Sequence, residues 1–243
     1  MFRRHSVVIA AVAISSWSCA ALLMAAGVAR GNVISQWTFN STGVDNDPTT
    51  GTLSPETGAG TITTVGGVSN SGFAQGSASD TSPSATGNNN SSFETQGYPP
   101  FDQNNKSAGI EIAVSTSGYQ DIGLSFEHNQ FSGASASFRI QYSTDGVNFT
   151  DATGYTGSSA GAFALRSDDF SAIPGLDNNP LAKFRIVAEF QGQMYSGLGG
   201  SYMPNARNRF DLVTVSGTPV PEPAMIGATM TLLAFGMRRR RRE

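Results

Sequence analysis

The chain has 243 residues, of which 39% are hydrophobic and 14% charged, and its formal net charge is −3. Eight of its 15 basic residues lie near the two ends, so residues 32–218 carry 7 basic and 16 acidic residues and a net charge of −9. This acidic body excludes nucleic acid as a partner, because phosphates require a basic surface, and with Cys19 as the only cysteine it excludes disulfides and thiolate chemistry from the body.

The N-terminal segment has the three parts of an export signal. Arg3, Arg4 and His5 form a positive start, and residues 7–28 are apolar or small. Gly27 and Ala29 place small residues at the −3 and −1 positions of a cleavage site. The sequence therefore predicts a signal helix over residues 1–29 that signal peptidase removes after Ala29, with cleavage after Gly31 as an alternative.

Residues 30–218 are predicted to form one all-β domain. Four segments alternate apolar and polar residues with period two, which is typical of strands with one face toward a core. They are residues 110–115, 122–127, 138–143 and 184–191, and further strands are expected at 33–40, 62–65, 162–170 and 210–216. Asp145-Gly146 between two such segments predicts a hairpin. We expect an antiparallel two-sheet sandwich that is jelly-roll-like.

The region 41–107 lacks a hydrophobic period. Between residues 76 and 92, 13 of 17 residues are Gly, Ser, Thr or Asn. Outside 62–65, this composition predicts long polar loops between an N-terminal strand and the main sheet, partly mobile.

No catalytic residue is assigned. His128, the only histidine after the export signal, lacks identifiable partners for catalysis or metal binding and is interpreted as a surface residue or a hydrogen-bonded loop residue. Asp168 and Asp169 are neighbours on a predicted strand, so their carboxylates point to opposite faces and do not form a catalytic pair.

Oxygen-rich loops provide candidate calcium ligands, although no metal or other cofactor is assigned. One set is Asp45 and Asp47, and the other is Asp145, Asn148 and Asp151; turn formation explains both sets as well, and neither has the spacing of a full calcium loop. Aromatic residues in loop-like sequence are candidates for stacking on sugar rings or for packing under loops. They are Tyr98, Phe101, Tyr155, Tyr195 and Tyr202.

The C-terminal segment 219–243 combines three features. Val220, Pro221, Glu222 and Pro223 form a rigid extended stretch, because proline fixes φ and removes a donor. Residues 224–237 are mostly apolar and predict a short transmembrane helix. A basic cluster follows that should stay on the cytoplasmic side. It consists of Arg238, Arg239, Arg240, Arg241 and Arg242.

This arrangement resembles a PEP-CTERM sorting signal of exported bacterial proteins. The resemblance implies that an exosortase reads Pro221-Glu222-Pro223, that the segment inserts transiently in the inner membrane, and that cleavage sends the body to the cell surface or the extracellular matrix. An ordinary C-terminal anchor is the alternative.

Two functional classes remain. The first is a non-enzymatic surface or biofilm-matrix protein that contacts exopolysaccharide or other matrix proteins. The second is a secreted hydrolase or lyase acting on glycans. The lack of a nucleophile motif, a histidine cluster or an acidic pair with clear geometry favours the first class.

Overall fold

The computed structural model describes residues 31–100, 103–157, 161–190, 196–197 and 200–221. Within these ranges no helix is long and apolar enough to span a membrane. The predicted signal helix and its cleavage residues lie outside the described residues, as do Glu222, Pro223, the apolar segment 224–237 and the arginine cluster.

Strands dominate the described chain. They are β1 (Asn32–Trp37), β2 (Thr61–Val65), β3 (Ser69–Gln75), β4 (Ser91–Gln96), β5 (Gly109–Ala113), β6 (Tyr119–Gln130), β7 (Ser137–Ser143), β8 (Thr150–Thr156), β9 (Phe163–Asp169), β10 (Lys183–Ala188), β11 (Ser196–Gly197), β12 (Gly200–Ser201) and β13 (Asn208–Pro219). Two single 3₁₀ turns, η1 (Pro83–Ala85) and η2 (Pro174–Leu176), lie in the connections.

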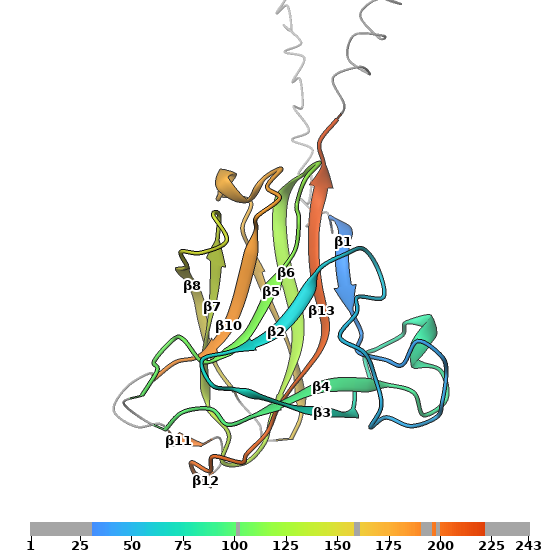
Figure 1. The fold of residues 1–243 in the computed structure, drawn as a ribbon, viewed down its shortest axis with the longest axis vertical. Helices are drawn as coiled ribbons and strands as arrows, with labels where there is room; N and C mark the ends of the chain where they lie inside the picture. The colour runs from blue at the N-terminus through green and yellow to red at the C-terminus, as the bar shows by residue number, and fades with distance from the viewer. Residues whose placement is uncertain (1–30, 101–102, 158–160, 191–195, 198–199, 222–243) are drawn as a thin grey trace, which may run out of the picture.

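The main strands form two antiparallel sheets packed face to face (Figure 1). Sheet A has the order β3-β4-β13-β6-β9, with β1 also paired to β13, and sheet B has the order β2-β5-β10-β7-β8. From β4 onward the main strands alternate between the two sheets except at the β7–β8 hairpin, which stays within sheet B. This winding is a jelly roll, and it confirms the predicted all-β antiparallel sandwich.

The core lies between the two sheets. Alternate residues of each strand point inward, as the period of two requires. Phe126 of β6, Phe184 of β10 and Trp37 of β1 are fully buried. The predicted hairpin joins β7 and β8, with Gly146 at φ 77° and the Asp145 carboxylate accepting from the backbone N–H of Val147 and Asn148.

The prediction of long polar loops at 41–107 is wrong in part. Besides the expected β2, the region contains β3, β4 and η1. Its order comes from buried polar contacts: Asn40 donates to Asp80 at 2.8 Å and accepts from the backbone N–H of Ser91 at 2.7 Å. Because these contacts use amide, carboxylate and backbone groups, they leave no hydrophobic period in the sequence.

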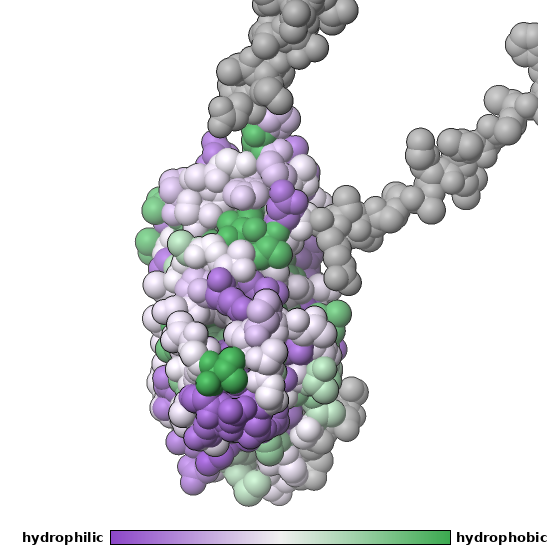
Figure 2. Space-filling model, turned by 90° about the vertical axis from the view of Figure 1, so that its right-hand side faces the viewer, coloured by the Kyte–Doolittle hydropathy of each residue, from purple (hydrophilic) through white to green (hydrophobic). Residues whose placement is uncertain are grey.

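Seen from the β1 side, the surface is mainly polar, and its apolar residues form small separate patches (Figure 2). The two ends of the body lie together, because Asn32 at the start of β1 pairs with Gly217 near the end of β13. Both ends therefore leave the sandwich at the same pole, and the exposed Val220 and Pro221 follow β13 directly.

Candidate functional site

The outer surface of sheet B is unusually rich in charged and amide side chains. Residues that alternate with the core residues of these strands must point away from sheet A. We call this surface the polar face. Its members are Thr61, Thr63, Glu111, Arg139, Gln141, Asp151, Lys183 and Arg185, joined by Lys106, Phe149 and Glu189.

One row of the polar face crosses all five strands. In the sheet register Thr63 lies beside Glu111, Glu111 beside Arg185, Arg185 beside Gln141, and Gln141 beside Asp151. With strands spaced by about 4.8 Å, this central row spans roughly 19 Å. It presents donors and acceptors in a fixed line.

The first half of the polar face is organised by a single carboxylate. Glu111 accepts from Lys183 Nζ at 2.8 Å and from Arg185 Nε at 2.8 Å, with Arg185 Nη2 at 2.6 Å. The Arg185 guanidinium also lies 3.6 Å from the centre of the Phe149 ring. These contacts hold three long side chains in one arrangement, which lowers the entropy they lose when a ligand binds.

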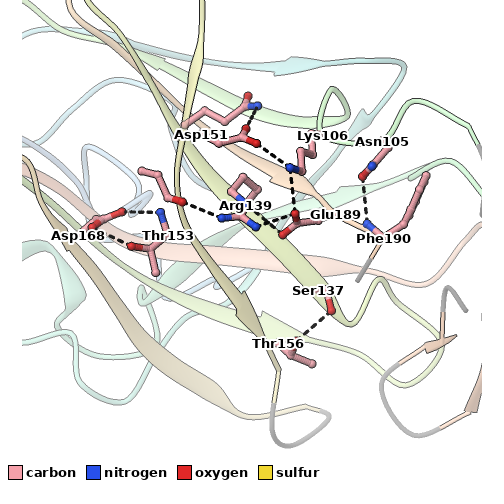
Figure 3. Close-up of polar contacts among 12 residues, drawn as sticks. Asn105, Lys106, Ser137, Arg139, Asp151, Thr153, Thr156, Asp168, Glu189 and Phe190 are labelled. Atoms are coloured by element: carbon pink, nitrogen blue, oxygen red, sulfur yellow. Dashed lines mark hydrogen bonds and ion pairs between the residues drawn. The ribbon is translucent and has the colours of Figure 1, made fainter. Parts of the chain in front are cut away.

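The second half is a mesh of two cations and two carboxylates. Figure 3 shows Lys106 between Asp151 and Glu189, at 2.6 and 3.2 Å. Arg139 binds Glu189 through Nε and Nη2, at 3.0 and 2.7 Å. Gln141 donates to Asp151 at 2.9 Å, which connects the mesh to the central row.

An open hollow continues the polar face beyond β2. It has a volume of about 540 Å³, and Thr61 and Thr63 belong to both surfaces. Leu53, Asn70 and Phe73 are among its other lining residues. A ligand lying across sheet B therefore meets a further concave surface at the sheet edge.

The carboxylates of the polar face lack the arrangement of a glycosidase pair. Burial would raise the pKa of Glu111, but hydrogen bonds from Lys183 and Arg185 outweigh it and leave the pKa lowered. Asp151 also has a lowered pKa, because hydrogen bonds from Lys106 and Gln141 outweigh the effect of burial. Three strand spacings, about 14 Å, separate the Cα atoms of Glu111 and Asp151. A general acid requires a raised pKa and a closer partner.

The prediction that His128 is a surface or loop residue is wrong. It lies inside β6 and is buried in the core, with Nδ1 2.9 Å from the Tyr155 hydroxyl and Nε2 3.2 Å from Asn208 Oδ1. Its ring stacks on Phe210, with 4.5 Å between the centroids. The reason is that β6 continues past Phe126, so His128 falls on the inward side.

Asp168 and Asp169 diverge, as expected for neighbours on a strand. Asp168 accepts from the backbone N–H and the hydroxyl of Thr153, both at 3.1 Å, and so ties β9 to β8 (Figure 3). Asp169 instead accepts from the backbone N–H of Ser171 at 2.9 Å.

The candidate calcium ligands have protein partners. Asp45 accepts from Ser41 and Thr50, and Asp47 accepts from Thr49. Asp145 and Asn148 meet at 2.7 Å, whereas Asp151 belongs to the polar face. Among the described residues, no three His, Cys, Asp or Glu side chains are grouped to hold a metal ion. Calcium binding stays a prediction.

The aromatic candidates contribute mainly to packing. Tyr98 is a core residue and the partly buried Tyr155 packs against the core, and burial raises the pKa of both hydroxyls. The Tyr202 hydroxyl donates to the backbone carbonyl of Tyr98. Phe101 and Tyr195 lie outside the described residues.

Asp151, a calcium candidate, is the only residue of the polar face that the sequence had indicated as a site residue, and the others, Phe149, Lys183 and Arg185 among them, were missed. Alternation was the available signal: Phe149 shares a side with Asp151, and Lys183 and Arg185 alternate with the core residues of β10. What alternation does not supply is the order of the strands, which places these residues beside Glu111.

No protein-family model matches the chain, and no curated protein matches its sequence. Among solved structures, the chain is similar to the CBM22-1 xylan-binding domain of Xyn10C from Paenibacillus barcinonensis, with 11% identity, a TM-score of 0.43, and coverage of 79% of this chain and 98% of that chain. It is also similar to the K1 cleaved adhesin domain of Lys-gingipain from Porphyromonas gingivalis W83, with 12% identity, a TM-score of 0.36, and coverage of 66% and 99%. Similarities this remote give no information about the ligand or the activity of this chain.

Proposed function

We propose that this chain is an exported cell-surface or extracellular-matrix protein whose sandwich binds carbohydrate through the polar face without catalysing a reaction. The central row on sheet B carries this proposal. Sugars offer many hydroxyls that both donate and accept, so their recognition requires fixed groups of both kinds. The row supplies carboxylates, a guanidinium and an amide that are already held in place by the protein.

A glycan-active hydrolase or lyase receives less support from the same residues. Glu111 and Asp151 stay ionised at neutral pH and are bound to cations, so neither is suited to donate a proton to a leaving group. Their roles on the polar face are to position Lys183, Arg185 and Lys106.

Binding is tested by measuring the affinity of the full-length protein on a glycan array and then in solution. Replacing Arg185 with alanine should weaken binding about tenfold or more, because it removes a charged donor from the middle of the row. The control is Arg207→Ala, which removes an exposed cation paired with Glu94 on sheet A and should change affinity less than twofold. Equal losses in both variants would place the binding surface elsewhere.

We also propose that segment 219–243 is a PEP-CTERM sorting signal cut by an exosortase, and that residues 1–29 are removed by signal peptidase. Both ends leave the body at one pole, which suits a body held at the membrane by either segment. Exosortase and signal peptidase are the partners in processing, and exopolysaccharide or other matrix proteins are the partners of the mature body.

The two proposed cleavages predict a specific mass for the mature protein. The mature protein should lack residues 1–29 and the region after Pro223, measured as the intact mass of protein recovered outside the cell. Replacing Pro221, Glu222 and Pro223 with alanine should leave the uncut precursor in the membrane fraction. The matched control is Thr218→Ala, an exposed residue just before the motif. Stable mature protein that retains Arg238–Arg242 would indicate a simple anchor.

A further inference from the structure

We infer that the polar face recognises a carboxylate on its ligand, so that the bound glycan is an acidic, uronic-acid-containing polysaccharide. This inference rests on the proposed carbohydrate binding and specifies the class of ligand. The subsite is formed by Lys183 and Arg185 on β10, around the Glu111 carboxylate of β5.

The distribution of charge is the first support. Residues 32–218 contain seven basic side chains, and among the described residues four of them lie on the polar face beside three carboxylates. The face thus carries a net charge of +1, and the remaining 3 basic and 13 acidic residues of the body give −10. Binding of a neutral glycan does not require this separation of positive and negative charge. An anionic glycan, in contrast, is attracted to this face and repelled from the rest of the body.

The position of the surplus charge is the second support. In the mesh around Glu189, two cations meet two carboxylates. In contrast, Lys183 and Arg185 share the single Glu111 carboxylate. The surplus positive charge of the polar face therefore lies at these two side chains.

Unused donors are the third support. Within the described part of the chain, Lys183 Nζ donates one hydrogen bond, to Glu111, although an ammonium group has three donors. Arg185 uses Nε and Nη2 for Glu111, and no described residue accepts from its Nη1. The side chains of Lys183 and Arg185 are 31% and 26% exposed, so a carboxylate from solution can reach both.

Neutral groups for the rest of a sugar chain adjoin the subsite. The exposed Thr61 and Thr63 lie two strands away in register with Lys183 and Arg185, across β5. Beyond them is the open hollow at the β2 edge. A polysaccharide crossing the sheet therefore meets cations in the middle and hydroxyl partners toward one side, which matches a chain with both carboxylates and hydroxyls.

The test compares polyuronates with their uncharged forms. Polygalacturonate, alginate and hyaluronate are each titrated into full-length protein alongside the methyl-esterified polymer, which keeps the sugar chain and removes the charge. We expect at least one polyuronate to bind, and its ester to bind at least tenfold more weakly.

Matched variants assign the discrimination to the subsite. Lys183→Gln should weaken binding of the charged polymer about tenfold and so reduce the preference for the charged polymer over its ester, whereas Lys183→Arg should retain that preference. Arg207→Gln, beside Glu94 of sheet A, makes the same change of charge elsewhere and should have less than a twofold effect. Thermal unfolding of each variant checks that the sandwich is intact; Lys183→Gln keeps the Arg185–Glu111 pair.

Four results would overturn the inference. Equal affinity for a polyuronate and its ester would refute recognition of a carboxylate but leave carbohydrate binding standing. If Lys183→Gln kept the full preference for the charged polymer over its ester, the carboxylate site would lie elsewhere. Binding to none of the polyuronates, with binding to neutral glycans on the array, would refute the acidic ligand; binding to no glycan at all would refute the proposed function as well.

Discussion

Phe126→Ala is expected to lower the free energy of unfolding by about 3–5 kcal/mol. Phe126 is fully buried in the middle of β6 and faces sheet B. Its ring packs against Phe210 and Tyr155, with centroids 6.3 and 6.0 Å away. Alanine would remove most of the buried aromatic surface and leave a cavity between the two sheets, which a rigid sandwich fills only in part.

The matched control is Leu165→Ala on the adjacent strand β9. Leu165 is a large apolar residue but is 66% exposed, on the opposite side of sheet A from the core. Its truncation should change the free energy of unfolding by no more than about 0.5 kcal/mol. Urea denaturation of both variants measures the difference. Similar losses in the two variants would contradict the assignment of inner and outer faces.

Local signals in the sequence were sufficient for much of the fold. Alternation placed Ile110 and Ile112 on one side of a strand, and both are buried in β5. Asp145-Gly146 identified the turn between β7 and β8 because Gly146 adopts a positive φ. Each of these inferences concerns residues within one strand or one hairpin, where the geometry depends on the neighbours in sequence.

Those local signals do not indicate which strands pair with each other in a sheet. Arg185 and Glu111 are 74 residues apart, and they meet because β10 pairs with β5. The alternation in the sequence indicates that both are outward residues of strands, but it does not predict which strands are adjacent. The same limit concealed β4, whose Ser91 and Ser92 are fully buried through hydrogen bonds to Thr50 and Ala74.

His128 illustrates a different limit. The alternation of Ile122, Leu124 and Phe126 continues to residue 128, so the pattern places the histidine on the core side. Its polar side chain led to the opposite interpretation. The structure resolves the conflict by giving both ring nitrogens a partner, the Tyr155 hydroxyl and the Asn208 amide, which reduces the cost of burying a polar ring.

The buried imidazole predicts acid-sensitive stability. Burial lowers the pKa of His128 from 6.5 to about 3; the hydrogen bond that Nε2 donates to Asn208 Oδ1 opposes this shift, and the positive charge of Arg166 adds to it. Between pH 6.5 and about 3 the unfolded chain binds a proton at this residue and the folded protein does not. The free energy of unfolding should therefore fall as the pH falls from 6.5 toward 3, by up to about 1.4 kcal/mol per pH unit.

The measurement is chemical denaturation between pH 7 and 4.5, compared with His128→Gln, which keeps a donor and an acceptor but does not titrate. The variant should lose the slope attributed to His128, whatever its stability at pH 7. Burial raises the pKa of Asp211 well above its usual range, so that group favours the folded state as the pH falls. Asp211 is present in both proteins, so its contribution cancels in the difference between the two curves. Parallel curves for wild type and variant would show that His128 is protonated in the folded protein or reached by solvent, and would contradict its place in the closed core.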